Sequence, residues 1–206
     1  MYMKIFVAGA TGRVGEELIK NLVEKGHTVY AGARRDDAIE ANESVTPVHL
    51  DLHGTIDEIA NTLTDAEAVY FVAGSRGKDL LQTDLFGAVK LMQAVEKKGI
   101  KRYIHLSSLF ALQPDKWSGA LTDYNISKFF SDNWLIDKTN LEYTILQPGS
   151  LKETPGSGKI TTNITEKSEN SIENVAAVLA ELLEQENTIK KVILMGDGNT
   201  PINEAL

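Results

Sequence analysis

The sequence predicts an α/β protein built on an open, doubly wound parallel sheet. Short apolar runs alternate with amphipathic helical stretches about six times along the 206 residues, without an internal repeat or a linker. Several runs are apolar throughout, such as residues 68–72, and this is typical of strands buried on both faces of a parallel sheet. Right-handed crossovers would place helices on both faces of the sheet and give three layers, α/β/α.

Apolar periodicity and turn residues locate the individual elements. Strands are expected at 4–8, 28–32, 46–50, 68–72, 102–106, 142–146 and 191–195. Helices are expected after the first strand, after Thr55, and at 79–98, 122–137 and 171–184. Thr55 and Glu58 have the spacing of a capping box, and Gly99 is placed to end the long helix. Residues 109–121 and 154–170 are expected to be loops, the second with at most a short strand or hairpin.

Composition excludes several classes of function. With 29 acidic and 21 basic residues, the net charge of −8 argues against nucleic acid as a partner. The absence of cysteine excludes disulfides, zinc–thiolate sites and thiol catalysis. Residues 1–3 lead straight into the first strand, and no apolar run approaches the roughly 20 residues of a membrane span. We therefore expect one cytoplasmic domain over residues 1–206, away from membranes, as a monomer or homodimer.

Three glycines stand between the first expected strand and the first helix, in the stretch 9–15. In that context their G-x-x-G-x-x-G spacing is typical of a dinucleotide cradle. Gly9 would let the chain turn sharply, Gly12 would admit a pyrophosphate to the backbone, and Gly15 would let the helix pack closely on the sheet. The N–H groups at the helix start would bind the anion. The expected cofactor-binding residues of this turn are Gly9, Thr11, Gly12, Arg13, Val14 and Gly15.

Two arginines after the second expected strand favour NADP over NAD as the cofactor. Arg34 lies 19 residues after Gly15, and Arg35 follows it directly. Guanidinium groups at this place accommodate a 2′-phosphate, whereas an acidic residue would bind the 2′-hydroxyl of NAD. Arg13 could reach the same phosphate from the glycine turn. The alternative is that these arginines are solvated and neutralised by the neighbouring acidic residues 36 and 37.

Further cofactor contacts are expected where the third and fourth strands end. Asp51 could meet the adenine amino group, with Leu52 beside it, and Ala73 and Gly74 follow the fourth strand. His49, Asp51 and His53 alternate as metal ligands on one strand face would. No further ligand cluster accompanies them, so we expect no metal site.

The spacing Tyr124-x-x-x-Lys128 places a phenol and an ammonium group on one helix face, one turn apart. The spacing alone is a weak signal, because chance gives about half a copy in a chain of this composition. Its position strengthens it. The motif opens the helix that follows the strand delivering Ser107 and Ser108, at the sheet edge where ligands bind.

These motifs together resemble the NAD(P)-binding atypical short-chain dehydrogenases, also called the NAD(P)H-binding or NmrA-like group. The resemblance covers essentially the whole chain and rests on residues 9–15, 51–52, 73–75, 107–108, 124–128, 143–149 and 172–176. It implies a Rossmann fold in which Tyr124 exchanges a proton with a carbonyl oxygen. It also implies that Lys128 holds the nicotinamide ribose and stabilises the phenolate. Ser108 would bind the substrate oxygen, with Ser107 as the second choice.

The expected function is NADP-dependent transfer of a hydride to or from a small carbonyl, quinone or related acceptor. Two departures from the family bear on the substrate: Gln147 replaces a frequent Arg, and residues 151–170 provide only a small substrate lid. Loops 75–78, 109–121 and 151–164 are expected to line the pocket, and Asp84 is expected to be a solvated helix charge. The alternative function is a redox sensor that binds NADP(H) without turnover. A nucleotide-sugar epimerase or dehydratase, which needs a larger substrate domain, ranks third.

Overall fold

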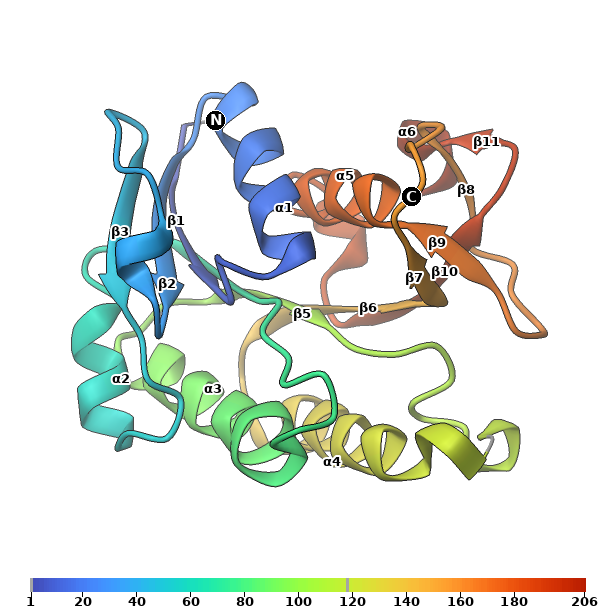
Figure 1. The fold of residues 1–206 in the computed structure, drawn as a ribbon, viewed down its shortest axis with the longest axis horizontal. Coiled ribbons are helices and arrows are strands. Elements are labelled where there is room, and N and C mark those ends of the chain that lie inside the picture. The colour runs from blue at the N-terminus through green and yellow to red at the C-terminus, as the bar shows by residue number, and fades with distance from the viewer. Residues whose placement is uncertain (1, 118) are drawn as a thin grey trace.

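A nine-stranded sheet forms the centre of the computed structural model, which describes residues 2–117 and 119–206 (Figure 1). The strand order is β11-β8-β10-β6-β5-β4-β1-β2-β3, and neighbours from β10 to β3 run parallel. The strands are β1 (Lys4–Ala8), β2 (Thr28–Ala33), β3 (Val45–His49), β4 (Ala68–Phe71), β5 (Arg102–Leu106), β6 (Glu142–Pro148), β8 (Lys159–Thr161), β10 (Lys191–Asp197) and β11 (Thr200–Pro201). The order reverses between β1 and β4, which confirms the doubly wound Rossmann fold.

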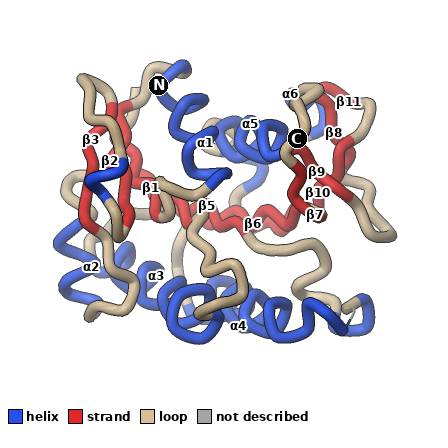
Figure 2. The backbone as a smooth tube through the Cα atoms, viewed as in Figure 1, coloured by secondary structure: helices blue, strands red, loops and turns tan. Residues whose placement is uncertain are grey.

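Helices cover both faces of this sheet, so the molecule has the three expected layers (Figures 1 and 2). Two of them, α1 and α5, pack on one face, and α2, α3 and α4 pack on the other. The helices are α1 (Arg13–Glu24), α2 (Ile56–Thr62), α3 (Ala88–Lys97), α4 (Thr122–Lys138), α5 (Ile172–Leu182) and α6 (Ile202–Ala205). Short 3-10 turns lie at Asp36–Ala38, Pro114–Lys116, Gly119–Leu121 and Glu186–Thr188.

The central strand β1 shows why the apolar runs are continuous. Ile5 and Val7 lie in the core shared with α1 and α5, whereas Phe6 and Ala8 lie in the core shared with α2 and α3. All four side chains are fully buried. Successive residues of a strand face opposite sides of the sheet, so a strand covered on both faces must be apolar at every position.

The expected long helix at 79–98 is wrong in its first half. Residues Leu80–Gly87 form a π-helix, η2, and the α-helix α3 begins only at Ala88. Polar side chains bind outside the regular helical pattern here: Thr83 donates to Asp79 at 2.6 Å, and Asp84 accepts from the Ser75 backbone at 3.0 Å. Such bonds compete with the α-helical ladder and hold these wider turns against the neighbouring loops. The expected capping box at Thr55 and the stop at Gly99, whose φ is +74°, are confirmed.

Residues 154–170 are more structured than the expected loop. They include most of β9 (Glu169–Ser171), which pairs in parallel with β7 (Ser150–Lys152) as a separate two-stranded sheet. They also contain β8, which adds antiparallel to β10 in the main sheet. Short pieces of strand such as these are decided by distant pairing partners, because three residues carry too little periodicity to reveal them.

Candidate cofactor and catalytic cleft

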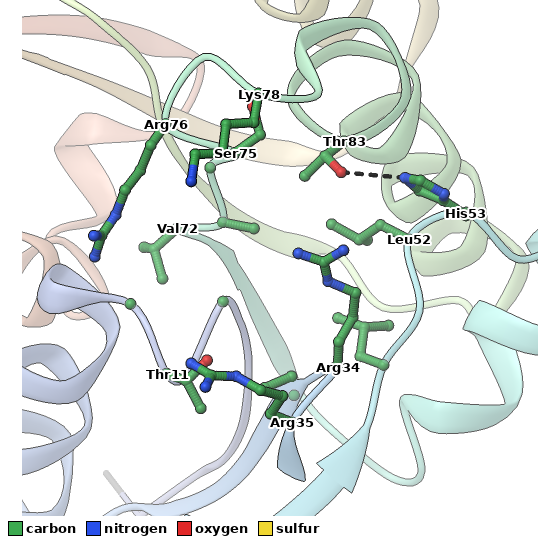
Figure 3. A pocket seen from close by; sticks show the side chains of 17 residues that line it. Thr11, Arg34, Arg35, Leu52, His53, Val72, Ser75, Arg76, Lys78 and Thr83 are labelled. Atoms are coloured by element: carbon green, nitrogen blue, oxygen red, sulfur yellow. Dashed lines mark hydrogen bonds between the residues drawn. The ribbon is translucent and has the colours of Figure 1, made fainter. Parts of the chain in front are cut away.

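Two adjoining cavities open at the carboxyl edge of the sheet, where the strand order reverses. The first lobe has a volume of about 670 Å³ and extends over the ends of β2 and β3 (Figure 3). The second lobe, of about 760 Å³, lies between the start of α1, the loop after β4 and the start of α4. Both lobes are lined by Gly12, Val72, Ala73, Gly74 and Arg76. They therefore form one elongated cleft, the shape that an extended two-part ligand requires.

The glycine turn forms the wall common to both lobes. Gly9 has a φ of +102°, and a Cβ there would lie 2.5 Å from the backbone nitrogen of Ala73. A Cβ on Gly15 would lie 2.2 Å from the carbonyl oxygen of Gly9, so α1 can pack on the turn only without a side chain. Gly12 caps α1 without a side-chain hydrogen bond. The first N–H groups of α1 are consequently left for an anion, and these residues fit a dinucleotide pyrophosphate.

Cationic side chains line the first lobe. Arg34 and Arg35 follow the end of β2, and Lys78 belongs to the loop after β4. Arg76 lines both lobes, and Figure 3 shows it across the opening from Arg34 and Arg35. Its φ of +54° is a strained conformation for a residue with a side chain, and such conformations concentrate at binding sites. The loop 75–78 lines the pocket as expected, and its cations Arg76 and Lys78 belong to no motif that would reveal them in the sequence.

Arg13 lies elsewhere than expected. It lines the second lobe and is absent from the lining of the first lobe, where Arg34 and Arg35 stand. Its Nη1 donates to Glu153 Oε1 at 3.0 Å, an ion pair between the glycine turn and the segment 151–170. Arg13 and the Arg34–Arg35 pair thus line different lobes, and the carboxylate of Glu153 attracts Arg13 toward the segment 151–170.

The alternating His49, Asp51 and His53 do not share a strand face. β3 ends at His49, and the carboxylate of Asp51 turns back to accept the backbone N–H of His53 at 2.9 Å. Asp51 lines neither lobe. His49 instead contacts Asp36 at 3.1 Å. Residues 2–117 and 119–206 contain no group of three histidine, cysteine or carboxylate side chains arranged to hold a metal ion.

A small polar cluster lies at the edge of the first lobe. His53 and Thr83 both line that lobe, and their side chains approach within 3.4 Å (Figure 3). Asp79 joins them, with Oδ2 2.6 Å from His53 Nε2 and 2.6 Å from Thr83 Oγ1. The hydrogen bonds from Thr83 and then His53 lower the pKa of Asp79 below its ordinary value. The cluster links the loop after β3 to the start of η2 and so shapes this end of the lobe.

The expected phenol–ammonium pair lies in the second lobe. Tyr124 and Lys128 both line it, and Lys128 Nζ is 5.7 Å from the centre of the Tyr124 ring. The Lys128 side chain is only 2% exposed, and its ammonium group donates to the carbonyl oxygen of Leu106 at 3.3 Å. The structure therefore joins the Tyr–Lys motif to the glycine turn in a single cleft.

The two serines after β5 contact α4, the helix that carries this pair. Ser108 is half-buried and its Oγ donates to Asn125 Oδ1 at 3.3 Å, next to Tyr124 in the chain. Ser107 is buried and its Oγ donates to Asp132 at 2.6 Å. Neither serine lines either lobe, so the role of Ser108 in binding a substrate oxygen stays a prediction.

A buried polar group surrounds Asp132, one turn beyond Lys128. Asp132 Oδ2 accepts from Ser107 and, at 2.9 Å, from Gln147 Nε2, while Oδ1 lies 3.4 Å from His105 Nε2. Burial raises the pKa of Asp132 to about 6, against the opposing effects of its hydrogen bonds and of the Lys128 charge. Burial, with the charge of Lys128, holds the pKa of His105 well below its ordinary value. Gln147, where the family often has Arg, serves this buried group and not the cleft.

The expectation of a solvated charge at Asp84 is wrong. Its side chain is fully buried and lines the second lobe. Oδ2 accepts from the backbone N–H of Ser75, and Oδ1 has no hydrogen-bond partner within the described part of the chain. Position could have indicated this, because Asp84 lies on the helical segment that follows the loop at the carboxyl end of β4.

Comparisons with known proteins show the family and the fold of this chain. Residues 9–186 match the NAD(P)H-binding family. The crystal structure of the oxidoreductase ylbE from Lactococcus lactis is 47% identical, with a TM-score of 0.95 over 98% of this chain and 94% of that chain. The uncharacterized sugar epimerase YhfK of Bacillus subtilis is 32% identical over 99% of both chains. A short-chain dehydrogenase/reductase from Veillonella parvula in complex with NADP shares the fold, at 20% identity and a TM-score of 0.77 over 97% of both chains.

The chain therefore belongs to the NAD(P)H-binding family, whose members are oxidoreductase-like Rossmann proteins. The family match supports binding of a dinucleotide cofactor. Within the described residues, no helix has the length and apolar character needed to cross a membrane.

Proposed function

We propose that this protein is an NADP-dependent oxidoreductase acting on a small carbonyl, quinone or related acceptor. One observation carries the proposal: Tyr124 and Lys128 line the same elongated cleft as the glycine turn, with the ammonium group 5.7 Å from the phenol ring. A proton donor and a cation beside a nicotinamide site are the groups that carbonyl reduction requires.

The first lobe would hold the adenosine half of the cofactor. Arg34 and Arg35 would bind the 2′-phosphate, and the N–H groups at the start of α1 would bind the pyrophosphate. Arg76, at the junction of the two lobes, would add a second cation near the pyrophosphate. Arginine at the end of β2 supports NADP over NAD, since none of the described residues that line this lobe has an acidic side chain to receive a 2′-hydroxyl.

The second lobe would hold the nicotinamide and the acceptor. When bound, the reduced nicotinamide supplies the hydride. Tyr124 would protonate the acceptor oxygen, and the buried ammonium group of Lys128 would stabilise the phenolate that remains. Ser108 would hydrogen-bond the acceptor oxygen. For this, its hydroxyl group would have to leave Asn125 Oδ1, to which it donates at 3.3 Å, and turn toward the lobe.

The direct test is oxidation of NADPH with a panel of aldehydes, ketones and quinones, followed at the absorbance band of reduced nicotinamide. Tyr124→Phe should lower kcat by about a hundredfold or more, with the Kd for NADPH changed less than about threefold. Tyr30→Phe, which alters a surface phenol bonded to Asp65, is the matched control and should keep full activity. Full activity in Tyr124→Phe would remove this phenol from the chemistry.

The same panel separates the competing functions. Tight NADPH binding without oxidation by any acceptor would favour a redox sensor. The name of the Bacillus subtilis relative, a sugar epimerase of nearly equal length, favours a nucleotide-sugar substrate as the second candidate. Interconversion of a nucleotide sugar without net consumption of cofactor would support that candidate. Arg34→Gln with Arg35→Gln should weaken NADPH binding and leave NADH binding nearly unchanged, and an equal loss for both would refute the preference for NADP.

A further inference from the structure

Three functional groups lie in a row along one face of α4. Tyr124, Lys128 and Asp132 follow each other at intervals of four residues, so they occupy successive turns of the same face. Tyr124 and Lys128 line the second lobe, whereas Asp132 is fully buried behind them. The row leads from the cleft, through an ammonium group, to a carboxylate in the interior.

The carboxylate of Asp132 ties this helix to two strands. Its Oδ2 accepts from Ser107 Oγ at 2.6 Å and from Gln147 Nε2 at 2.9 Å. Ser107 directly follows β5, and Gln147 lies near the end of β6. One oxygen atom thus holds α4 in position against the two strand ends next to the second lobe. The strand β5 also supplies the Leu106 carbonyl oxygen that Lys128 binds.

The charges of Lys128 and Asp132 also connect these two residues. Lys128 is a buried cation, and a buried cation requires a nearby negative charge because its hydration has been lost. The charge of Lys128 favours the ionised form of Asp132. The other titratable groups facing Asp132 come from β5: His105, which is held neutral, and Tyr103, whose pKa is raised well above its ordinary value by burial and by the charge of Asp132. Asp84, from η2, lines the same lobe as Lys128 and binds the Ser75 backbone.

We propose that Asp132 is a positioning residue for the Tyr124–Lys128 pair: its carboxylate fixes α4 on the ends of β5 and β6 and provides the buried negative charge opposite Lys128. The proposal rests on the proposed function, in which Tyr124 and Lys128 act beside the nicotinamide. Asp132 itself touches neither lobe, and it acts through Lys128.

Asp132→Asn separates charge from shape. The amide oxygen can still accept from Ser107 and Gln147, so only the negative charge is lost. We expect kcat at pH 7 to fall about tenfold or more. In the wild type, kcat should also decrease as the pH falls through about 6, the pKa of Asp132, and this acidic limb should be absent from Asp132→Asn.

A second readout does not need turnover. The emission of bound NADPH, measured at saturating cofactor, reports the surroundings of the nicotinamide. In the wild type it should change with pH near 6, and in Asp132→Asn it should not. If the wild-type protein shows no turnover, the proposed oxidoreductase function is refuted. The emission of bound NADPH would then decide the role of Asp132. Identical emission and rate profiles in the two proteins would overturn the positioning role.

Two further variants exclude a merely structural effect. Asp132→Asn combined with Gln147→Glu moves the carboxylate to the other member of the same bonded pair, 2.9 Å away. This double variant should recover most of the lost kcat if charge is what Asp132 provides, and failure to recover it in a folded protein would count against the proposal. Asp137→Asn removes an exposed carboxylate from the same helix and should leave both profiles unchanged. Far-ultraviolet circular dichroism shows whether each variant is folded.

Discussion

Asp132→Asn should make the folded protein more stable at neutral pH, and the gain can be calculated from the burial of this carboxyl group. The ordinary pKa of 3.8 rises to about 6 in the folded state. Between these values the folded protein binds the proton more tightly than the unfolded chain does, so stability falls as the pH rises. At about 1.36 kcal/mol per pH unit, the charged carboxylate costs about 3 kcal/mol above pH 6. The neutral asparagine avoids that cost and keeps the acceptor for Ser107 and Gln147.

Urea unfolding at a series of pH values from 4 to 8 measures this difference. The two tryptophans, Trp117 and Trp134, provide the fluorescence signal. The stability of Asp132→Asn relative to wild type should increase by about 2 kcal/mol between pH 4 and pH 7, and Asp137→Asn should show no such increase. A constant difference across this range would show that the pKa of Asp132 is not raised. If Asp132→Asn is more stable but less active than wild type, the wild-type protein keeps a destabilising buried charge because its activity needs it.

Two other substitutions test the packing that shapes the cleft. Gly15→Ala places a Cβ 2.2 Å from the Gly9 carbonyl oxygen, so the turn must move. The free energy of unfolding should fall by about 1–3 kcal/mol, and the Kd for NADPH should rise at least about tenfold. Unchanged NADPH binding, measured by titration of cofactor fluorescence, would show that the turn does not form the cradle. Tyr70→Phe removes the buried hydrogen bond from the Tyr70 hydroxyl to the Leu179 carbonyl oxygen. The free energy of unfolding should fall by about 1 kcal/mol, and NADPH binding should be unchanged. A loss of NADPH binding would contradict a purely structural role for Tyr70.

The elements whose causes are local could be predicted from sequence. The apolar run 4–8 becomes β1, and the Thr55–Glu58 capping box begins α2 as expected. The glycine turn could also be predicted, because the positive φ of Gly9 and the close approach at Gly15 are requirements of the turn itself. In each case a few neighbouring residues carry the whole signal.

The features that depend on distant partners could not be predicted in this way. Asp84 looks like a surface charge in the sequence, yet the Ser75 backbone and the second lobe enclose it. Arg13 is drawn toward Glu153, which lies 140 residues away in the chain. The burial of Asp132 requires the ends of β5 and β6 to be in place around it. Periodicity along one segment contains no information on such contacts.

By itself, the sequence determined the doubly wound sheet, the glycine turn and the Tyr124–Lys128 pair on one helix face, because strand and helix periods and helical spacing are local properties. Tertiary structure alone decided that the turn and this pair line adjoining lobes of one cleft, with a buried carboxylate behind the ammonium group. The physical reason is that burial and charge act through space. A carboxylate acquires a pKa near 6 only when the folded chain removes its water, and here burial outweighs the opposing charge of Lys128.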